Sequence, residues 1–262
     1  MNHCTKLGWL AIGALALGLN FWFVPAQAAP PITNINLNQA GWSLGFGFLG
    51  AGFPYQGASS WNRFIPLFNY STPGFYIHGL SIGWHLDESG PLHVDVVAEP
   101  ETLHYNAGFS PRFHGLSTRL ASAMGGLALV YRRGFLGIRA SALTDLLSRS
   151  DGQKIRAMLF AHMVSGGWFF DPRAGVEWES ASFVNYYFGI PGYEASPLHP
   201  AYAPGSTLNT LLEFLVGRQL GSHFTAMGGL EEEFYGAGIR ASPLVSRSSS
   251  LSYVVGLYFR FR

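Results

Sequence analysis

The side chains that could carry out catalysis in this sequence are a group of histidines followed by many serines. His78, His85, His93, His104 and His114 lie in one part of the chain. A serine, a histidine and an acid in hydrogen-bonding order form the triad of hydrolases and acyltransferases. No G-x-S-x-G segment places a serine for this chemistry, and the histidines fall on different expected strands and faces. We therefore predict no catalytic residues and no enzyme activity.

A metal site is the second chemistry that these histidines could support. His78 and His85 are separated by an odd number of residues, which places them on opposite faces if they share one strand. His93 and Asp95 share a face, but polar neighbours of this kind are usual on the inner face of a membrane barrel. The prediction is therefore that the chain binds no metal ion and no cofactor.

Charged side chains of both signs fall on the polar faces of segments that alternate in polarity. We expect these groups to face a barrel lumen and to pair with one another there. They are Asp95, Glu99, Arg139, Arg156, Glu177, Glu213 and Arg260.

The run Glu231, Glu232 and Glu233 places acid on both faces at the end of an expected strand. A carboxylate facing lipid at mid-bilayer would cost about 2 kcal/mol or more. We therefore expect this run at a membrane rim, as a solvated strand end in preference to a cation or partner contact.

The elements that would position these groups are strands, because apolar and polar residues alternate with a period of two. In the segment that starts at Gly41, Trp42, Leu44, Phe46 and Phe48 alternate with glycine and serine. The clearest case is the last segment, 251–261, in which every second residue is large and apolar. Each segment therefore has one apolar face and one small or polar face.

Eleven segments are candidate strands. They are 42–48, 63–70, 75–86, 92–99, 120–131, 136–142, 154–163, 174–180, 210–220, 223–235 and 251–261. Single-chain bacterial barrels close with an even number of strands, each of about 9 to 11 residues. The sequence predicts an all-β fold, a closed antiparallel transmembrane β-barrel of 10 to 12 strands. The small residues on the inner faces predict a narrow lumen filled with side chains.

Composition and the amino terminus indicate an exported membrane protein. Only 12% of the residues are charged and 15% are aromatic, with a net charge of +1, which disfavours a nucleic-acid binder. Lys6, the apolar run 7–24 and Ala26-Gln27-Ala28 form a signal peptide pattern. We predict a signal peptide at 1–28 and one barrel domain at 29–262, without lipid anchor or disulfide because the only cysteine, Cys4, precedes the apolar run.

A soluble β-sandwich or barrel is the alternative, because alternation also describes a sheet with one wet face. The signal peptide, together with aromatic residues near strand ends, favours the membrane barrel and its interfacial girdles. These aromatics include Trp42, Tyr70, Trp84, Tyr131, Trp178 and Tyr253. The predicted location is the outer membrane of a Gram-negative bacterium, in contact with lipid and lipopolysaccharide.

Several short motifs, in order along the chain, resemble the MipA/OmpV family of outer-membrane proteins, also called the MltA-interacting protein family. They lie at 54–57, 66–70, 74–77, 185–190, 194, 202–205, 242–245 and 258–261. The residues that carry the resemblance include Pro54, Tyr55, Gly57, Pro66, Tyr70, Asn185, Tyr186, Tyr187, Gly189, Glu194, Ser242, Pro243 and Phe261.

The resemblance implies a non-enzymatic scaffold that contacts a lytic transglycosylase and helps to bring the hydrolases and synthases of murein (peptidoglycan) together. It defines no catalytic residues. Two other functions stay open from the sequence. A channel for small solutes or antibiotics is consistent with the polar inner faces, and a lipid-modifying enzyme at the barrel rim would need a serine and a histidine within hydrogen-bond distance at one end.

Overall fold

The chain folds into a closed antiparallel barrel of twelve strands, which confirms the predicted fold class. The computed structural model describes residues 41–58, 60–87 and 90–261, so the predicted signal peptide lies outside the described residues. The strands are β1 (Gly41–Ala51), β2 (Trp61–Ser71), β3 (Phe75–His78), β4 (Ser81–Asp87), β5 (Leu92–Glu101), β6 (Ser122–Arg133), β7 (Leu136–Asp145), β8 (Gln153–Ala161), β9 (Met163–Ser165), β10 (Trp168–Glu179), β11 (Thr207–Leu220), β12 (Phe224–Phe234) and β13 (Ser249–Arg260). Strands β8 and β9 both pair with β10 and form one barrel strand interrupted at His162.

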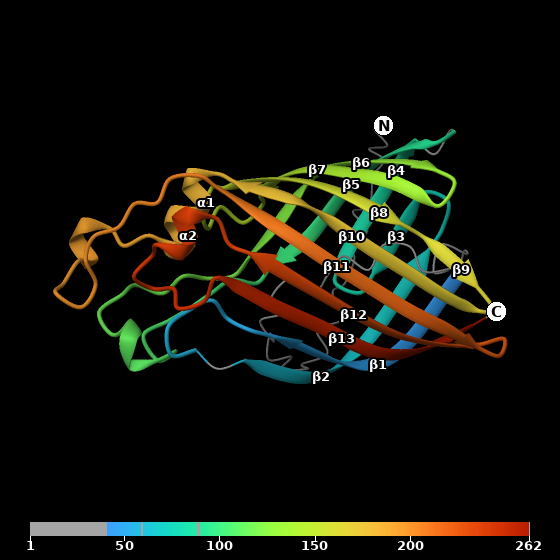
Figure 1. Cartoon of the computed structure of the whole chain (residues 1–262), viewed down its shortest axis with the longest axis horizontal. Helices are drawn as coiled ribbons and strands as arrows, with labels where there is room; N and C mark the ends of the chain where they lie inside the picture. Colours follow the sequence, from blue (N-terminus) through green and yellow to red (C-terminus); the bar gives the residue numbers. More distant parts are fainter. Residues whose placement is uncertain (1–40, 59, 88–89, 262) are drawn as a thin grey trace, which may run out of the picture.

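Pairing of β1 with β13 closes the barrel, with Ser43 opposite Arg260 (Figure 1). Closure leaves no free sheet edge at this junction, as a membrane barrel requires because lipid cannot satisfy backbone polar groups. The two strands pair over nine residues, and the start of β1 and the end of β13 lie at the end of the barrel with the short turns (Figure 1). The long connections all gather at the opposite end.

The alternation of side chains gives the wall an apolar outer face and a packed interior. Outward residues such as Phe48 (57% exposed) and Leu159 (64% exposed) form the belt that faces lipid, whereas the inward Tyr258 is 1% exposed. Inside, Leu49, Leu67, Phe169, Leu215, Met227, Val254 and Tyr258 form one apolar cluster. Within the described residues, no helix is long and apolar enough to cross a bilayer.

Glycines on the inner face allow neighbouring strands and side chains to approach closely. A Cβ atom at Gly45 would lie 2.1 Å from the backbone oxygen of Leu257 on β13. At Gly126, a Cβ would lie 2.0 Å from the backbone oxygen of Ala142 on β7. The close approach explains why this face tolerates no side chain at these positions.

The segment 75–86, expected as one strand, is the hairpin of β3 and β4, which turns at Gly79 and Leu80. Gly79 has φ +61°, a conformation that glycine adopts without strain. The hairpin is short: β3 pairs with β2 only through Asn69, Tyr70 and Ser71. The hairpin accounts for the strand that the count of eleven segments lacked.

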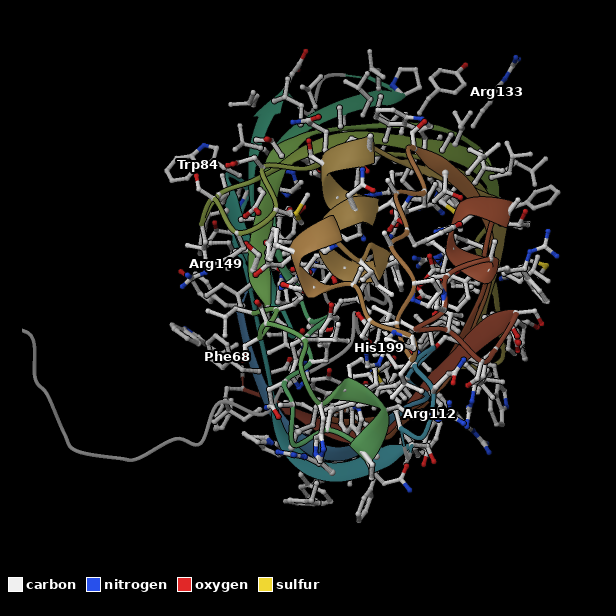
Figure 2. The ribbon with its side chains drawn as sticks, turned by 90° about the vertical axis from the view of Figure 1, so that its left-hand side faces the viewer. Phe68, Trp84, Arg112, Arg133, Arg149 and His199 are labelled. Carbon is white, nitrogen blue, oxygen red and sulfur yellow. The ribbon has the colours of Figure 1, made fainter. Side chains whose placement is uncertain are left out.

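A cap built from the long connections closes one end of the barrel (Figure 2). We call residues 52–58, 102–121, 180–206 and 235–248 the loop cap. It contains α1 (Ala181–Phe188), α2 (Ala237–Arg240) and the 3-10 turns η2 (Pro111–Phe113) and η3 (Gly192–Glu194). Its core includes Tyr55, Phe113, Phe183 and Tyr187, which pack with lumen-facing residues such as Met124. The side chains of the cap therefore pack directly on the side chains inside the barrel, and the two sets form one continuous apolar core.

Helix α1 lies between the expected strands 174–180 and 210–220, where the sequence pattern predicted no strand. The side chain of Ser180 accepts a hydrogen bond from the backbone N–H of Phe183 and caps the helix. Phe183, Val184, Tyr187 and Phe188 form one buried stripe with helical spacing. The stripe fixes the helix across the mouth of the barrel.

Candidate functional site

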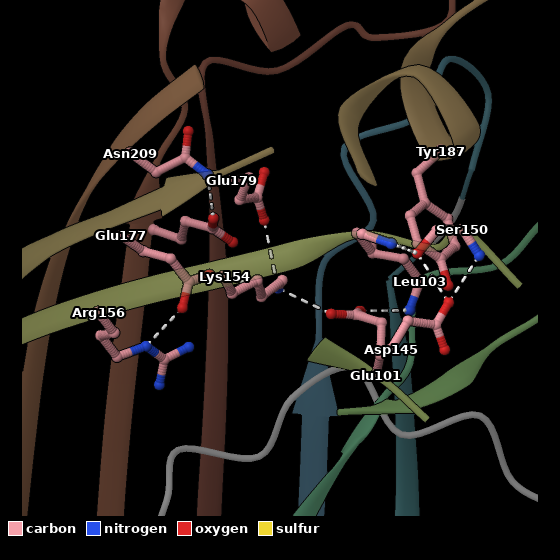
Figure 3. Close-up of polar contacts among 12 residues, drawn as sticks. Glu101, Leu103, Asp145, Ser150, Lys154, Arg156, Glu177, Glu179, Tyr187 and Asn209 are labelled. Carbon is pink, nitrogen blue, oxygen red and sulfur yellow. Dashed lines mark hydrogen bonds and ion pairs between the residues drawn. The ribbon is translucent and has the colours of Figure 1, made fainter. Parts of the chain in front are cut away.

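Lys154 is the centre of a buried charged cluster inside the barrel, beneath the loop cap (Figure 3). Its Nζ lies 2.7 Å from Glu101 Oε2, 3.2 Å from Glu177 Oε1 and 3.2 Å from Glu179 Oε1. Arg156 Nε donates to Glu177 Oε2 at 2.6 Å. We call Glu101, Lys154, Arg156, Glu177, Glu179, Glu213, Glu231 and Glu233 the lumen network.

Strand register assembles the lumen network. Pairing of β8 with β10 places Lys154 opposite Glu179 and Arg156 opposite Glu177, so each cation faces a carboxylate across the sheet. On the next pair of strands the register sets Glu213 opposite Glu231, two like charges. Each cation of the network is therefore matched on β8 and β10, whereas the facing pair Glu213 and Glu231 holds two carboxylates, of which Glu213 also faces Arg173 on β10.

The lumen network surrounds a cavity of about 40 Å³. Carboxylate oxygens of Glu177, Glu179 and Glu233 lie within 4.8 Å of one another, close enough to share one cation. Glu233 also accepts a hydrogen bond from Asn209 Nδ2 at 2.6 Å. Oxygen ligands of this kind suit hard divalent cations.

Two polar pairs, each of a histidine with an aspartate, lie deeper in the lumen. His85 Nδ1 is 2.7 Å from Asp95 Oδ1, and His162 Nδ1 is 2.5 Å from Asp171 Oδ1. Arg173 links the second pair to the lumen network, with Nη2 at 3.7 Å from Asp171 and Nη1 at 3.3 Å from Glu213. Polar contacts therefore run from the cap side of the lumen toward the short turns.

The expected placement of His78 and His85 on opposite faces of one strand is wrong. Because the hairpin reverses the chain between them, both rings lie against Tyr76, with centroid distances of 4.6 Å and 4.9 Å. The odd spacing would separate them only if the strand were continuous. The odd spacing of His78 and His85 therefore does not exclude a metal site that both could share.

Three serine and histidine pairs come within hydrogen-bond distance in the described part of the chain. Ser71 Oγ lies 3.0 Å from His78 Nε2, but both residues are buried and His78 Nδ1 has no partner. Ser196 and His199 lie in the cap, and Ser222 and His223 lie in a short turn. No carboxylate among the described residues hydrogen-bonds to these three histidines, so none of the pairs continues into an ordered triad.

The structure places the seven charged residues predicted for the lumen in different environments. Arg156, Glu177 and Glu213 belong to the lumen network, and Asp95 pairs with His85 beside Tyr76 and Arg139. Glu99 is half-buried, and its charge interacts with Arg156 of the lumen network. Arg260 is half-buried at the end of β13. Sequence reasoning missed Lys154, Glu101 and Glu179, although Lys154 shares a face with Arg156 and Glu179 shares one with Glu177.

The run 231–233 corrects the expectation of a solvated strand end. Glu231 is 6% exposed and lines the cavity together with Glu233, whereas Glu232 faces outward and accepts a hydrogen bond from Ser249 Oγ at 2.6 Å. The reason is that the cap covers this end of β12. The acid on the inner face is buried beneath it.

Most of the residues that carried the family resemblance lie in the loop cap and hold its loops together. Ser242 Oγ donates to the Phe188 carbonyl at 2.7 Å, and Tyr55 OH donates to the Tyr187 carbonyl at 3.3 Å. Pro54 and Gly57 flank Tyr55, Asn185 and Tyr186 lie in α1, Gly189 ends it, and Pro243 follows Ser242. Pro66 and Tyr70 lie on β2, and Phe261 follows β13.

A buried ion pair joins two loops of the cap. Arg119 Nη2 donates to both carboxylate oxygens of Glu194, at 3.0 and 3.2 Å, and its Nε donates to the Tyr186 carbonyl at 2.9 Å. The guanidinium also lies 5.8 Å from the ring of Tyr105. Burial raises the pKa of Tyr105 to about 12, partly offset by the positive charge of Arg119.

A closed barrel with an apolar outer belt and a filled lumen defines an integral protein of the bacterial outer membrane. The chain belongs to the family described as MltA-interacting protein MipA, whose model matches residues 44–261.

Two relatives illustrate this membership. A putative outer membrane protein YiaT of Escherichia coli O157:H7 is 25% identical over 84% of this chain and 90% of its own length. A MltA-interacting protein of Escherichia coli K12 is 23% identical over 84% of this chain and 90% of its own. Among solved structures, the NanC porin is 12% identical with a TM-score of 0.45, covering 84% of this chain and 100% of that one.

Proposed function

We propose that this protein is a non-enzymatic outer-membrane anchor that holds a murein-processing enzyme, a lytic transglycosylase in particular, near the membrane. One observation carries the proposal: the lumen is filled by two side-chain clusters and covered by the loop cap. Because the lumen of such a barrel is filled, a partner protein would bind at the turns and loops at its two ends. Membership of a family named for interaction with MltA supports a partner of this class, together with a murein synthase.

The short turns are the end at which we place this partner. Barrels of this class have short periplasmic turns and longer external loops, so the loop cap faces outward and the short turns face the murein. The turn between β6 and β7 presents Arg133 and the side chain of Phe135, which is 57% exposed. A cation beside an exposed aromatic ring is a composition favoured in protein interfaces.

Site-specific photo-crosslinking in living cells tests the proposal. A photoreactive amino acid at Phe135 should capture a lytic transglycosylase, whereas the same group at Tyr193, which is 84% exposed in the cap, should not. Both positions are exposed, so the comparison isolates the end of the barrel. Capture of this enzyme from Tyr193 alone, or of no murein enzyme from any of the short turns, contradicts the proposal.

A small-solute or antibiotic channel is the second candidate. The observation that favours it is the succession of charged side chains from Lys154 to Asp171, groups that line selective pores. Planar-bilayer recording decides between the two functions. The anchor predicts no discrete current steps, and deletion of the gene would leave antibiotic uptake unchanged.

The serine and histidine pairs define the test of a lipid-modifying activity. In the pair of Ser71 and His78, Ser71 is buried and His78 Nδ1 has no hydrogen-bond partner, so nothing orients the ring as a general base. A Ser71→Ala variant should leave the lipid and lipopolysaccharide profile of the membrane unchanged. A change in acyl composition would assign the chain a catalytic role.

A further inference from the structure

The cavity beneath the loop cap is lined by more acid than base. Five carboxylates surround it, from Glu101, Glu177, Glu179, Glu231 and Glu233. The two cations that line it are Lys154 and Arg156. Their hydrogen-bond-length contacts all go to Glu101, Glu177 and Glu179.

The Oε2 atom of Glu231 has no hydrogen-bond partner among the described residues, although the residue is 6% exposed and lines this cavity. Its neighbour across the strand pair is the like-charged Glu213. A second buried oxygen, Oε2 of Glu179, also has no hydrogen-bond partner. Buried charges are normally paired or coordinate a metal, so these groups point to a missing positive charge.

The geometry restricts what that charge can be. Ligand oxygens of Glu177, Glu179 and Glu233 lie within 4.8 Å of one another, and they come from the adjacent ends of β10 and β12 on either side of β11. A cavity of about 40 Å³ has room for one ion with about one or two waters. A sugar, a nucleotide or an amino acid needs far more space.

We propose that this cavity binds one Ca²⁺ ion through the carboxylates of Glu177, Glu179 and Glu233, with Glu231 adding negative charge to the same wall. Ca²⁺ accepts carboxylates in variable geometry, whereas Mg²⁺ keeps several waters, for which the cavity lacks room. Phe188, Tyr235 and Ile239 of the cap also line the cavity. The ion therefore joins β10 to β12 directly beneath the cap and stabilises the covered end of the barrel.

Binding to the refolded full-length barrel in detergent provides the first test. Calorimetric titration with CaCl₂ at pH 7.5 should give one site. Tb³⁺, a luminescent substitute for Ca²⁺, should show emission sensitised by the nearby Tyr235, and Ca²⁺ should displace it. Absence of saturable binding up to 5 mM Ca²⁺, a ceiling of about the weakest known protein Ca²⁺ sites, overturns the proposal.

Neighbouring glutamates on opposite faces of β12 supply a matched control. Glu233→Gln and Glu231→Gln should weaken Ca²⁺ binding about tenfold or more, because affinity depends on the charge of the ligands. Glu232→Gln makes the same chemical change on the outer face, where Ser249 contacts the side chain, and should leave affinity unchanged. Equal affinity in all three variants, or equal weakening, contradicts the assignment.

Thermal unfolding distinguishes loss of a Ca²⁺ ligand from misfolding when a variant binds Ca²⁺ poorly. Without Ca²⁺, Glu231→Gln removes a repulsion with Glu213, so its unfolding midpoint in EDTA should equal or exceed that of the wild type. Addition of Ca²⁺ should raise the wild-type midpoint and that of Glu232→Gln by several degrees. A Glu231→Gln variant that is less stable than the wild type in EDTA would contradict the unpaired charge on which the inference rests.

Discussion

Replacing Arg119 by methionine should open the loop cap while leaving the barrel folded. The substitution keeps much of the length of the side chain but removes the two hydrogen bonds to Glu194 and the one to the Tyr186 carbonyl. Glu194 would then be a buried charge without its partner, since the side chains of the pair are only 8% and 4% exposed.

The magnitude follows from the burial of the pair. Removing one partner of a buried ion pair costs about 3–5 kcal/mol, and the two cation–π contacts, to Tyr105 and Tyr186, add about 0.5–1 kcal/mol each. The total is about 4–7 kcal/mol, and at 1.4 kcal/mol for each tenfold change, opening of the cap becomes about three to five orders of magnitude more frequent. The strand ladders do not involve this pair, so the change is local.

Hydrogen exchange and limited proteolysis of the detergent-solubilised barrel measure this opening. Amides of residues 102–121 and 190–202 should lose protection, whereas those of β1 and β13 should not. Arg149→Met, at an exposed arginine in the connection between β7 and β8, is the control and should change nothing. The double variant Arg119→Met, Glu194→Leu should recover most of the protection. Unchanged protection in Arg119→Met would refute the reasoning.

Three other predictions concern the wall, its lipid contact and the cap tyrosines. Gly45→Leu places a side chain against the backbone of Leu257, so the barrel should fail to close, which heat-modifiable mobility on SDS gels would detect; normal folding would contradict the close approach. Leu159→Arg should destabilise the barrel by about 2–4 kcal/mol in urea titrations, while Leu147→Arg, in a connection beyond the strands, should cost far less; similar losses would contradict the lipid belt. Burial raises the pKa of Tyr105 to about 12 from about 10 in an unfolded chain. Its contribution to cap stability is therefore full below pH 10 and is lost as the pH rises through 12, which protease sensitivity of the cap across this window would show; a cap that opens below pH 9 would contradict it.

Local alternation was sufficient to predict the strands and the faces of most of them. In β8, Ile155 and Leu159 face lipid and Lys154 and Arg156 face the lumen, as period two requires. The same pattern contained a signal for the missed hairpin. Apolar residues are odd-numbered at Phe75 and Ile77 and even-numbered from Ile82 onward, and such a change of parity marks a reversal or a bulge.

The sites could not be derived in the same way, because they depend on register and on contacts between distant segments. Lys154 meets Glu101 across several strands of the barrel, and Arg119 meets Glu194 across 75 residues of chain. No local pattern records these distances. Helix α1 did carry a local signal, Ser180 before the helically spaced Phe183 and Tyr187, but its length of eight residues is close to that of a strand.

Because the hairpin of β3 and β4 is short, the barrel wall resists mechanical force less at this hairpin than elsewhere. Eleven residue pairs join β1 to β2, whereas three join β2 to β3. The backbone N–H of Gly79 adds one more bond, to the Phe68 carbonyl at 3.0 Å. When lateral tension in the bilayer or an applied force stretches the barrel wall, β2 and β3 therefore separate first. The junction between β1 and β13, which has nine residue pairs, separates at a higher force.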